Sequence, residues 1–341
     1  MKRFAALLLA LAMVFALCAC SNGDTGEKGK DDQEVINWDY LSIIPTSNPA
    51  MKPIVDFVNE VKEATNGRLV ITIREPGELP FTNSEYVRAI GEGSAQMGWG
   101  LMPSIAGDLN GSAALSLPFM IQNSDDLKKA MDAIGDTLSE ELGAYGADTL
   151  FYFNMPAQNL FGSGTPVKTF SDAQKLLIRA TGSEMSDFIN SIGGVPVTID
   201  NSEVPTSLSR GVVNSVITSA LNCYGNSWNE NLDWAYMFNL QADTVLTLVN
   251  KQALQALPDD VRATLLEISA KYTDLSMKTI ADAENDAIAK LKEAGMTFTD
   301  AAQSDVDAKV AEYTAYWDTW AQSRGGNAVD CVKAIRTALG K

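Results

Sequence analysis

The chain has 341 residues and a formal net charge of −17, with 26 Lys and Arg against 43 Asp and Glu. Because such an acidic surface repels phosphate backbones, we expect no nucleic-acid partner. The sequence contains no histidine, which removes His-containing metal sites and the Ser-His or Cys-His pairs of many hydrolases. We therefore expect no metal, no other cofactor and no catalytic residues.

The first residues have the pattern of a cleaved export signal. A basic pair precedes an apolar run over residues 4–17, which is too short to cross a bilayer core that needs roughly 20 apolar residues. The Leu-Cys-Ala-Cys sequence at residues 17–20 resembles a bacterial lipobox; the alternative is an ordinary secreted protein with a chance cysteine. We predict a signal peptide over residues 1–19, lipidation at Cys20 and a flexible polar tether over residues 20–34. The protein would then be extracytoplasmic and anchored to the cell membrane as a lipoprotein.

After the tether, strand and helix patterns alternate. β-branched and apolar runs predict strands over residues 35–44, 69–73, 95–101 and 149–154. Apolar residues at helical spacing predict helices over residues 50–64, 84–91 and 124–145. Repeated units of this kind are typical of a mainly parallel sheet covered by helices.

A second set of units begins near residue 176. Strands are predicted over residues 176–180, 195–198 and 213–218, and helices over residues 183–192 and 202–210. A further strand at 244–250 leads into a long helix over residues 258–294. We predict an α/β fold of two lobes, with that helix spanning both. The first lobe would contain residues 35–155 and 243–282, and the second residues 156–242 and 283–341.

Short motifs along this alternation resemble those of one protein family. In the first lobe they are Thr65-Asn66-Gly67-Arg68-Leu69, Gly77-Glu78-Leu79, Ile90-Gly91-Glu92-Gly93 and Leu117-Pro118-Phe119. In the second lobe they are Leu177-Ile178-Arg179, Gly193-Gly194-Val195-Pro196-Val197 and Ser202-Glu203-Val204. Each motif is weak alone, but their order and spacing resemble the DctP-type substrate-binding subunits of TRAP (tripartite ATP-independent periplasmic) transporters.

The resemblance implies a bilobed, periplasmic-binding-protein-like fold with a ligand cleft between the lobes. It implies a monomeric protein, not an enzyme, that captures a small organic acid by cleft closure and delivers it to the transporter's membrane subunits. The alternatives are a binding protein that reports its ligand to a membrane receptor and, as the weaker of the two, an enzyme. Four residues depart from the family pattern, so the substrate of better-known members cannot be transferred: Lys175, Pro205, Asn214 and Ile217.

Arg179 is the central candidate for ligand binding. It closes an apolar strand, so its guanidinium should emerge at the carboxyl end of the strand, where open α/β sheets bind ligands. A guanidinium matches a carboxylate with two parallel hydrogen bonds. The alternative is a surface arginine paired with Asp187 or Glu184, but the resemblance favours the ligand-binding role.

The other candidate site residues follow from alignment with the family. Gln158 or Asn159 stands where many members have a second arginine, and a neutral amide there disfavours dicarboxylates. The remaining ligand-lining positions are Ile43, Trp99, Leu101, Asn201, Thr218 and Asn239, although Trp99 could equally pack in the core.

Together these residues predict a monocarboxylate ligand with an apolar or hydroxylated body, such as an amino or keto acid. An amino acid would need a carboxylate such as Glu75 or Asp200 near its amine. The sequence also leaves open whether Cys223 and Cys331 form a disulfide, because spacing alone does not show that two cysteines meet.

Overall fold

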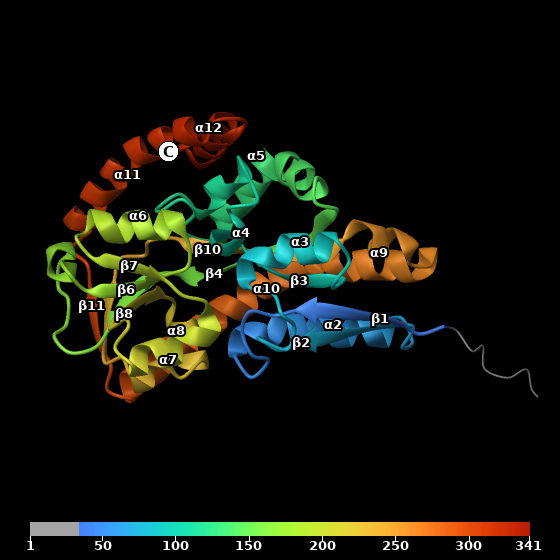
Figure 1. Cartoon of the computed structure of the whole chain (residues 1–341), viewed down its shortest axis with the longest axis horizontal. Helices are drawn as coiled ribbons and strands as arrows, with labels where there is room; N and C mark the ends of the chain where they lie inside the picture. The colour runs from blue at the N-terminus through green and yellow to red at the C-terminus, as the bar shows by residue number, and fades with distance from the viewer. Residues whose placement is uncertain (1–33) are drawn as a thin grey trace, which may run out of the picture. The chain divides into compact units, whose positions relative to one another are not determined.

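The computed structural model describes residues 34–341, and residues 35–341 form one compact unit. The predicted signal peptide, the lipidation site Cys20 and all but the last residue of the predicted tether lie outside the described residues. The described chain contains two β-sheets with helices packed on them, as Figure 1 shows. The predicted α/β class is therefore confirmed. No helix within residues 34–341 is long and apolar enough to cross a membrane.

The first sheet has the strand order β2-β1-β3-β10-β4. Its strands are β1 (Ile36–Leu41), β2 (Leu69–Arg74), β3 (Met97–Leu101), β4 (Ala147–Ala157) and β10 (Ala242–Asn250). β1 pairs in parallel with β2 and β3, whereas β10 runs antiparallel to β3 and β4. The sheet is thus mixed rather than mainly parallel, because β10 returns from the second sheet and enters the first in the opposite direction.

The second sheet has the order β11-β9-β5-β8-β6-β7. Its strands are β5 (Asn159–Gly162), β6 (Leu177–Ala180), β7 (Val195–Thr198), β8 (Ser215–Thr218), β9 (Trp234–Met237) and β11 (Thr297–Asp300). β6 pairs in parallel with β7 and β8, while β5 is antiparallel to β8 and β9. This sheet is also mixed, because β5 continues the line of β4 into it.

Helices connect the strands within each sheet. On the first sheet they are α2 (Lys52–Ala64), α3 (Tyr86–Gly91), α4 (Met102–Ile105), α5 (Ser124–Gly143) and α9 (Lys251–Ala256). On the second they are α6 (Ser183–Ser191), α7 (Val204–Ser209) and α8 (Ala220–Gly225). Short 3-10 turns lie at Pro49–Met51, Asn83–Glu85, Ser112–Ser116, Phe170–Ala173, Asn201–Glu203 and Trp228–Glu230.

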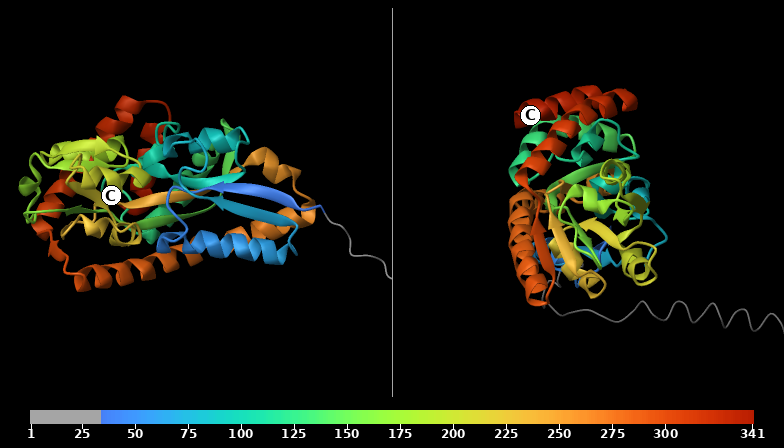
Figure 2. Two further views of the ribbon diagram at one scale, coloured as in Figure 1. Left: turned by 60° about the horizontal axis from the view of Figure 1, so that its bottom comes forward. Right: turned by 90° about the vertical axis from the view of Figure 1, so that its left-hand side faces the viewer.

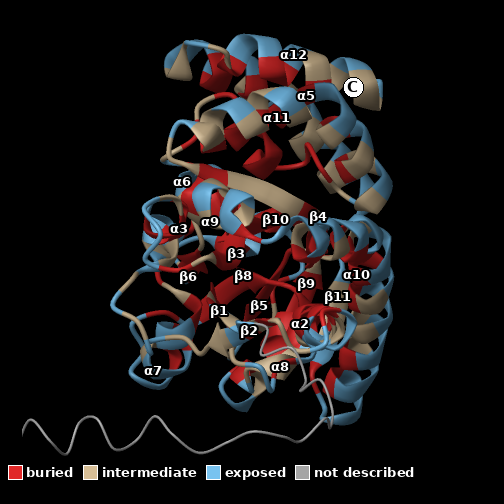
Figure 3. Cartoon of the chain, turned by 90° about the vertical axis from the view of Figure 1, so that its right-hand side faces the viewer, coloured by how far each residue is buried: buried red, intermediate tan, exposed pale blue. Residues whose placement is uncertain are grey.

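Local sequence explains where the longer helices begin and which face they bury. In α5 the side chain of Asn123 accepts from the backbone nitrogen of Asp126, which satisfies one of the free N–H groups of the first turn. Its buried residues recur three and four positions apart, from Leu127 to Leu142. Figure 3 shows the same division throughout, with buried residues on the strands and inward helix faces and exposed residues on the outer faces.

Helix α10 (Asp259–Glu293) has 35 residues and extends past both sheets (Figure 2). It packs against α2 and β4 of the first sheet and against α8 of the second, so the predicted long helix is confirmed. α11 (Gln303–Arg324) and α12 (Ala328–Leu339) follow, and α12 packs on α5. The lobe boundaries stay a prediction, but this packing brings the end of the chain back to the first sheet.

Two short segments carry the chain between the sheets. Gln158 separates β4 from β5, and residues 238–241 separate β9 from β10. The segments are bonded to each other: the backbone nitrogen of Gln158 donates to Gln241 O at 2.7 Å, and that of Leu240 to Gln158 O at 2.9 Å. Asn239 has a left-handed backbone with φ 53°, which asparagine tolerates better than most residues. The backbone therefore turns at Asn239, between β9 and β10.

The two cysteines of the described chain are separate. Cys223 and Cys331 are both buried and both free. No disulfide therefore joins α8 to α12.

Candidate functional site

Arg179 lies near the end of β6 and is only 2% exposed. Its Nε donates to Ile199 O at 2.8 Å, and its Nη2 donates to Asn201 Oδ1 at 2.7 Å. The guanidinium carbon also lies 5.6 Å from the ring centre of Trp228, a cation–π contact. Among residues 34–341, no acceptor is found for Nη1. The guanidinium is thus fixed on two sides and open on the third.

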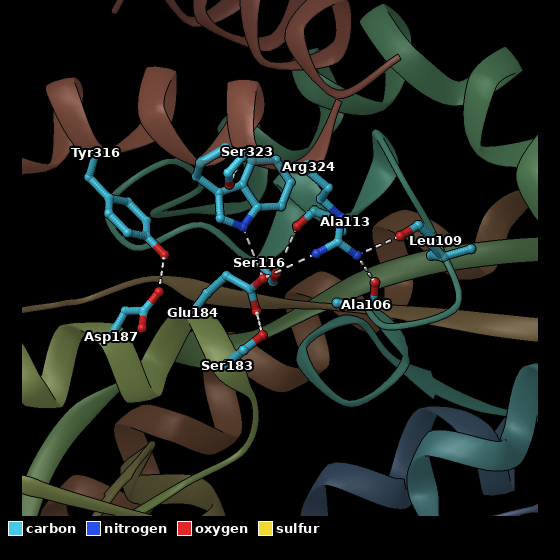
Figure 4. A network of polar contacts seen from close by, with 11 residues as sticks. Ala106, Leu109, Ala113, Ser116, Ser183, Glu184, Asp187, Tyr316, Ser323 and Arg324 are labelled. Carbon is cyan, nitrogen blue, oxygen red and sulfur yellow. Dashed lines mark hydrogen bonds and ion pairs between the residues drawn. The ribbon is translucent and has the colours of Figure 1, made fainter. Parts of the chain in front are cut away.

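The alternative of a surface Arg179 paired with Asp187 or Glu184 does not hold, because Arg179 is buried and both of those carboxylates have other partners. Asp187 Oδ2 accepts from the hydroxyl of Tyr316 at 2.6 Å. Glu184 Oε1 accepts from Trp320 Nε1 at 3.1 Å and lies 3.6 Å from Arg324 Nη1. Figure 4 shows these contacts between α6 and α11.

A small cavity lies beside Arg179, lined by residues of both sheets and of the segments between them. Its volume is about 20 Å³, room for roughly one water molecule. The lining residues are Ile43, Ile44, Trp99, Leu101, Met155, Gln158, Arg179, Thr181, Asn201, Ser219, Asn222 and Asp243. The first sheet and the loop after β1 contribute the apolar lining residues together with the charged Asp243, and the elements of the second sheet contribute only polar ones.

Six of the nine predicted site residues line this cavity: Ile43, Trp99, Leu101, Gln158, Arg179 and Asn201. Thr218 is not among the lining residues; its Oγ1 accepts from Asn222 Nδ2 at 3.0 Å. Asn159 and Asn239 are also absent from the lining. Asn159 Oδ1 instead accepts from the backbone nitrogens of Phe238 and Asn239, at 2.7 and 2.8 Å. Asn159 and Asn239 thus belong to the contact that holds the two connecting segments together.

Trp99 and Gln158 each combine a structural contact with a place in the cavity wall. Trp99 packs edge-to-face on Phe153 with ring centres 5.3 Å apart and also lines the cavity, while its role in ligand binding stays a prediction. Its Nε1 is buried without a partner within the described chain. Gln158 Nε2 donates to Pro156 O at 2.7 Å, and no donor to its Oε1 is found within residues 34–341. Two residues of the cavity wall in addition to Arg179 thus carry a polar atom without a partner in the described chain, an indole donor and an amide acceptor.

Asp243 is the most consequential residue that the sequence did not indicate. It lies at the start of β10, is 3% exposed, and accepts from Gln241 Nε2 at 2.6 Å. Neither Glu75 nor Asp200 lines the cavity; Glu75 binds the side chain and backbone of Thr46. The sequence did contain one sign of a role for Asp243: it is the single charged residue in the otherwise uncharged run of residues 240–250.

Arg179 and Asp243 place opposite charges on the same cavity without forming an ion pair. No pair with N···O within 4.0 Å joins them among the described residues. Burial lowers the pKa of Arg179 to about 10, and the nearby Asp243 carboxylate opposes that shift. Burial raises the pKa of Asp243 to about 6, opposed by the Gln241 hydrogen bond and by the Arg179 charge. Both groups are mainly ionised at neutral pH, so the cavity carries a dipole.

A larger open groove adjoins the cavity. It has a volume of about 440 Å³ and shares Ile43 and Asn201 with the cavity wall. Glu75 and Trp228 also line it. Within residues 34–341, no cluster of three His, Cys, Asp or Glu side chains could hold a metal ion.

The chain has two mixed β-sheets covered by helices, with short crossing segments between them and a polar cavity where they meet. This is the architecture of bilobed solute-binding proteins. The fold is similar to a Bordetella pertussis extracytoplasmic solute receptor that binds pyroglutamic acid, with a TM-score of 0.81 and 23% identity over 89% of this chain and 100% of that one. A TRAP periplasmic solute-binding protein of Shewanella oneidensis with bound succinate has a TM-score of 0.80 and 17% identity, covering 89% and 99% of the two chains.

Sequence comparison identifies the family. Residues 42–323 match the bacterial extracellular solute-binding proteins, family 7 (DctP). The C4-dicarboxylate-binding periplasmic protein DctP of Rhodobacter capsulatus is 27% identical over 303 residues, which is 86% of this chain and 89% of that protein. The chain belongs to solute-binding protein family 7, and the motif resemblance is confirmed. Members of this family are substrate-binding proteins of TRAP transporters rather than enzymes.

Proposed function

We propose that this protein captures a small organic monocarboxylate in the cavity beside Arg179 and delivers it to the membrane subunits of a TRAP transporter. The observation that carries the proposal is the free Nη1 of a buried, doubly anchored guanidinium. A carboxylate is the group that such a fixed cation binds best. Similar folds hold pyroglutamate, D-glucuronate and succinate, all of them carboxylic acids, which supports this class of ligand.

The wall of the cavity supports a ligand with a compact apolar body. Ile43, Leu101 and Met155 line it together with the polar residues. Asp243 contributes a negative charge, so the second carboxylate of a dicarboxylate would meet like charge there. A monocarboxylate avoids this repulsion.

Capture requires the two sheets to move apart, because a cavity of about 20 Å³ is too small for any organic acid. The bonded segments at Gln158 and residues 238–241 are the short connections about which such a motion can occur. Closure would then bring Arg179, from the second sheet, against Trp99, from the first. The lipid anchor at Cys20 and a monomeric state are parts of the proposal that rest on the sequence.

Mass spectrometry of the denatured protein tests the function directly. Protein purified without added ligand should release a carboxylic acid, and Arg179→Ala should release much less of the same compound. Arg210→Ala is the matched control, since Arg210 is an exposed arginine that does not line the cavity. Equal amounts of ligand in Arg179→Ala and wild type, or a ligand without a carboxylate, would contradict the proposal.

A further inference from the structure

Asp243 presents an unexpected feature in a cavity built to bind an anion. A carboxylate beside the binding site for another carboxylate weakens binding, unless the ligand places a hydrogen-bond donor against it. Asp243 has a single side-chain donor among the described residues, Gln241 Nε2. An ionised carboxylate has room for several more hydrogen bonds. Its remaining acceptor capacity is available to a ligand.

A second acceptor lies on the wall of the same cavity. Gln158 lines the cavity; one N–H of its Nε2 donates to Pro156 O, and its Oε1 receives no hydrogen bond within residues 34–341. On the donor side, Arg179 Nη1 and Trp99 Nε1 have no partner within residues 34–341. The unpaired donors match the oxygens of a carboxylate. The unpaired acceptors need an N–H or O–H on the ligand.

Charge favours the same kind of ligand. With Arg179 and Asp243 both ionised, the cavity wall is dipolar and has no net charge from this pair. A ligand with its own dipole, negative toward Arg179 and positive or N–H-bearing toward Asp243, satisfies both groups. A dicarboxylate or a simple fatty acid adds no donor to Asp243 in a closed cavity, so Gln241 Nε2 stays its single side-chain donor and the remaining acceptor capacity is left unsatisfied, which is costly.

We propose, building on the function proposed above, that Asp243 is a specificity-determining residue that accepts a hydrogen bond from a nitrogen of the ligand. The ligand class is then a small monocarboxylate with an N–H close to its carboxylate. Both α-amino acids, through an ammonium group, and cyclic amide acids, through a lactam N–H, belong to this class. The carboxylate would bind Arg179 and the nitrogen would face Asp243.

Matched ligand pairs test the nitrogen directly, using calorimetry on the full-length protein after removal of co-purified ligand. L-Proline is compared with tetrahydrofuran-2-carboxylate, and L-pyroglutamate with 5-oxotetrahydrofuran-2-carboxylate, so that each pair differs in N–H against ring oxygen. In wild type the nitrogen compound of at least one pair should bind about 10- to 100-fold more tightly. Equal affinity within both pairs, or no binding of either nitrogen compound at millimolar concentration, would overturn the proposal.

Variants of Asp243 then test whether this residue causes the preference for the nitrogen compound of each pair. Asp243→Leu should bring the ratio within a pair close to one. Asp243→Asn keeps an acceptor for Gln241 and for a lactam N–H, but it should lose most of the preference for the charged amine of proline. Asp200→Asn is the matched control, a neighbouring carboxylate that does not line the cavity, and should keep the wild-type ratio. A wild-type ratio in both Asp243 variants would refute the assignment.

The two proposals fail in different ways. If Arg179→Ala weakens all four compounds while the Asp243 variants change nothing, carboxylate capture stands and the role of Asp243 falls. If Arg179→Ala binds all of them as wild type does, the capture function itself falls. Thermal unfolding of each variant verifies that the protein is folded, and Asp243→Asn keeps the test valid if Asp243→Leu does not fold.

Discussion

At the scale of single residues, the proposed site contains a cation whose orientation is fixed by the protein itself. Ile199 O and Asn201 Oδ1 each accept one hydrogen bond from Arg179, and Trp228 covers its face. A group fixed in this way loses little conformational entropy when it binds a carboxylate. Trp228 belongs to a short turn far along the chain from β6, so the orientation is a product of tertiary packing.

Two replacements of Arg179 should show how much of the ligand affinity comes from its positive charge and how much from its two parallel hydrogen bonds. Arg179→Ala removes the partner of a buried carboxylate and should weaken ligand binding by roughly 2–5 kcal/mol, or about 30-fold to several thousand-fold. Arg179→Lys should recover only part of the loss, because an ammonium group cannot form two parallel hydrogen bonds. Calorimetric titration of both variants with the ligand released by the wild type checks this expectation.

The stability of these variants is the necessary control. Because Arg179 is buried and bonded, its loss leaves the Ile199 carbonyl without its donor, and we expect a decrease of about 1–3 kcal/mol in the free energy of unfolding. Binding is therefore measured well below the melting temperature. Wild-type affinity in a folded Arg179→Ala protein would exclude Arg179 as the carboxylate-binding residue.

The sequence indicated Arg179 but not Asp243, for a physical reason. Arg179 follows an apolar strand, and that local pattern places it at the ligand-binding end of a sheet. Asp243 reaches the cavity only because β10 returns beside the bend at Gln158, a contact between segments about 85 residues apart in the chain. Local sequence patterns cannot predict a contact between segments so far apart in the chain.

At the scale of elements, the long periodic segments and several strands were predicted, but three short strands were not. The strand predicted at 195–198 corresponds to β7, and the helix predicted at 124–145 to α5 within two residues. The strands β5, β9 and β11 have only four residues each, and β5 and β9 are almost wholly buried. A short strand buried on both faces has no alternation to detect.

The contact between α10 and α8 should make stability depend on pH. Glu284 on α10 accepts from the backbone nitrogens of Ala220 and Leu221, at 3.1 and 2.6 Å. Burial raises the pKa of Glu284 to about 7, although these two N–H groups oppose the shift. Because the folded pKa lies above the unfolded one, the contribution to stability is complete at acidic pH and is lost as pH rises through 7. From about pH 5 to about pH 8 this group should lower the free energy of unfolding by up to about 3 kcal/mol.

Urea unfolding at several pH values checks the Glu284 prediction. Glu284→Gln keeps an acceptor for the two backbone nitrogens but cannot ionise, so its stability should vary less with pH than that of the wild type. Glu267→Gln is the matched control, an exposed glutamate on the same helix. Asp243 contributes a slope of the same sign, since its pKa is also raised. Identical slopes in wild type and Glu284→Gln would refute the role of Glu284.

At the scale of the whole molecule, the small cavity and the adjoining groove predict a change in dimensions on binding. In the proposed capture, ligand enters while the sheets are apart and is then enclosed from both sides. Solution X-ray scattering should therefore give a smaller radius of gyration with saturating ligand than after ligand removal. Equal values in the two states, for a ligand shown to bind, would contradict closure about the crossing segments.

A second contact between the two sides of the cleft lies at the end of α11. Arg324 Nη2 donates to the carbonyl oxygens of Ala106 and, at 2.6 Å, Leu109, which follow α4 of the first sheet. Its Nη1 lies 3.6 Å from Glu184 Oε1, at the start of α6 on the second sheet. Figure 4 shows the guanidinium between these partners. One arginine thus connects both sides when the cavity is closed.

Arg324→Ala should therefore weaken the closed form more than the open one. If the sheets move apart, Arg324 cannot keep both sets of partners, and the bonds it loses stabilise only the closed form. We expect ligand to dissociate about 5- to 30-fold faster from Arg324→Ala, the effect of roughly 1–2 kcal/mol, with a small change in association rate. Stopped-flow displacement measures both rates. Arg336→Ala is the matched control, since Arg336 pairs with Asp318 of the neighbouring helix α11 and touches neither sheet through that pair. An unchanged dissociation rate in Arg324→Ala would show that its contacts move as one body with a single lobe.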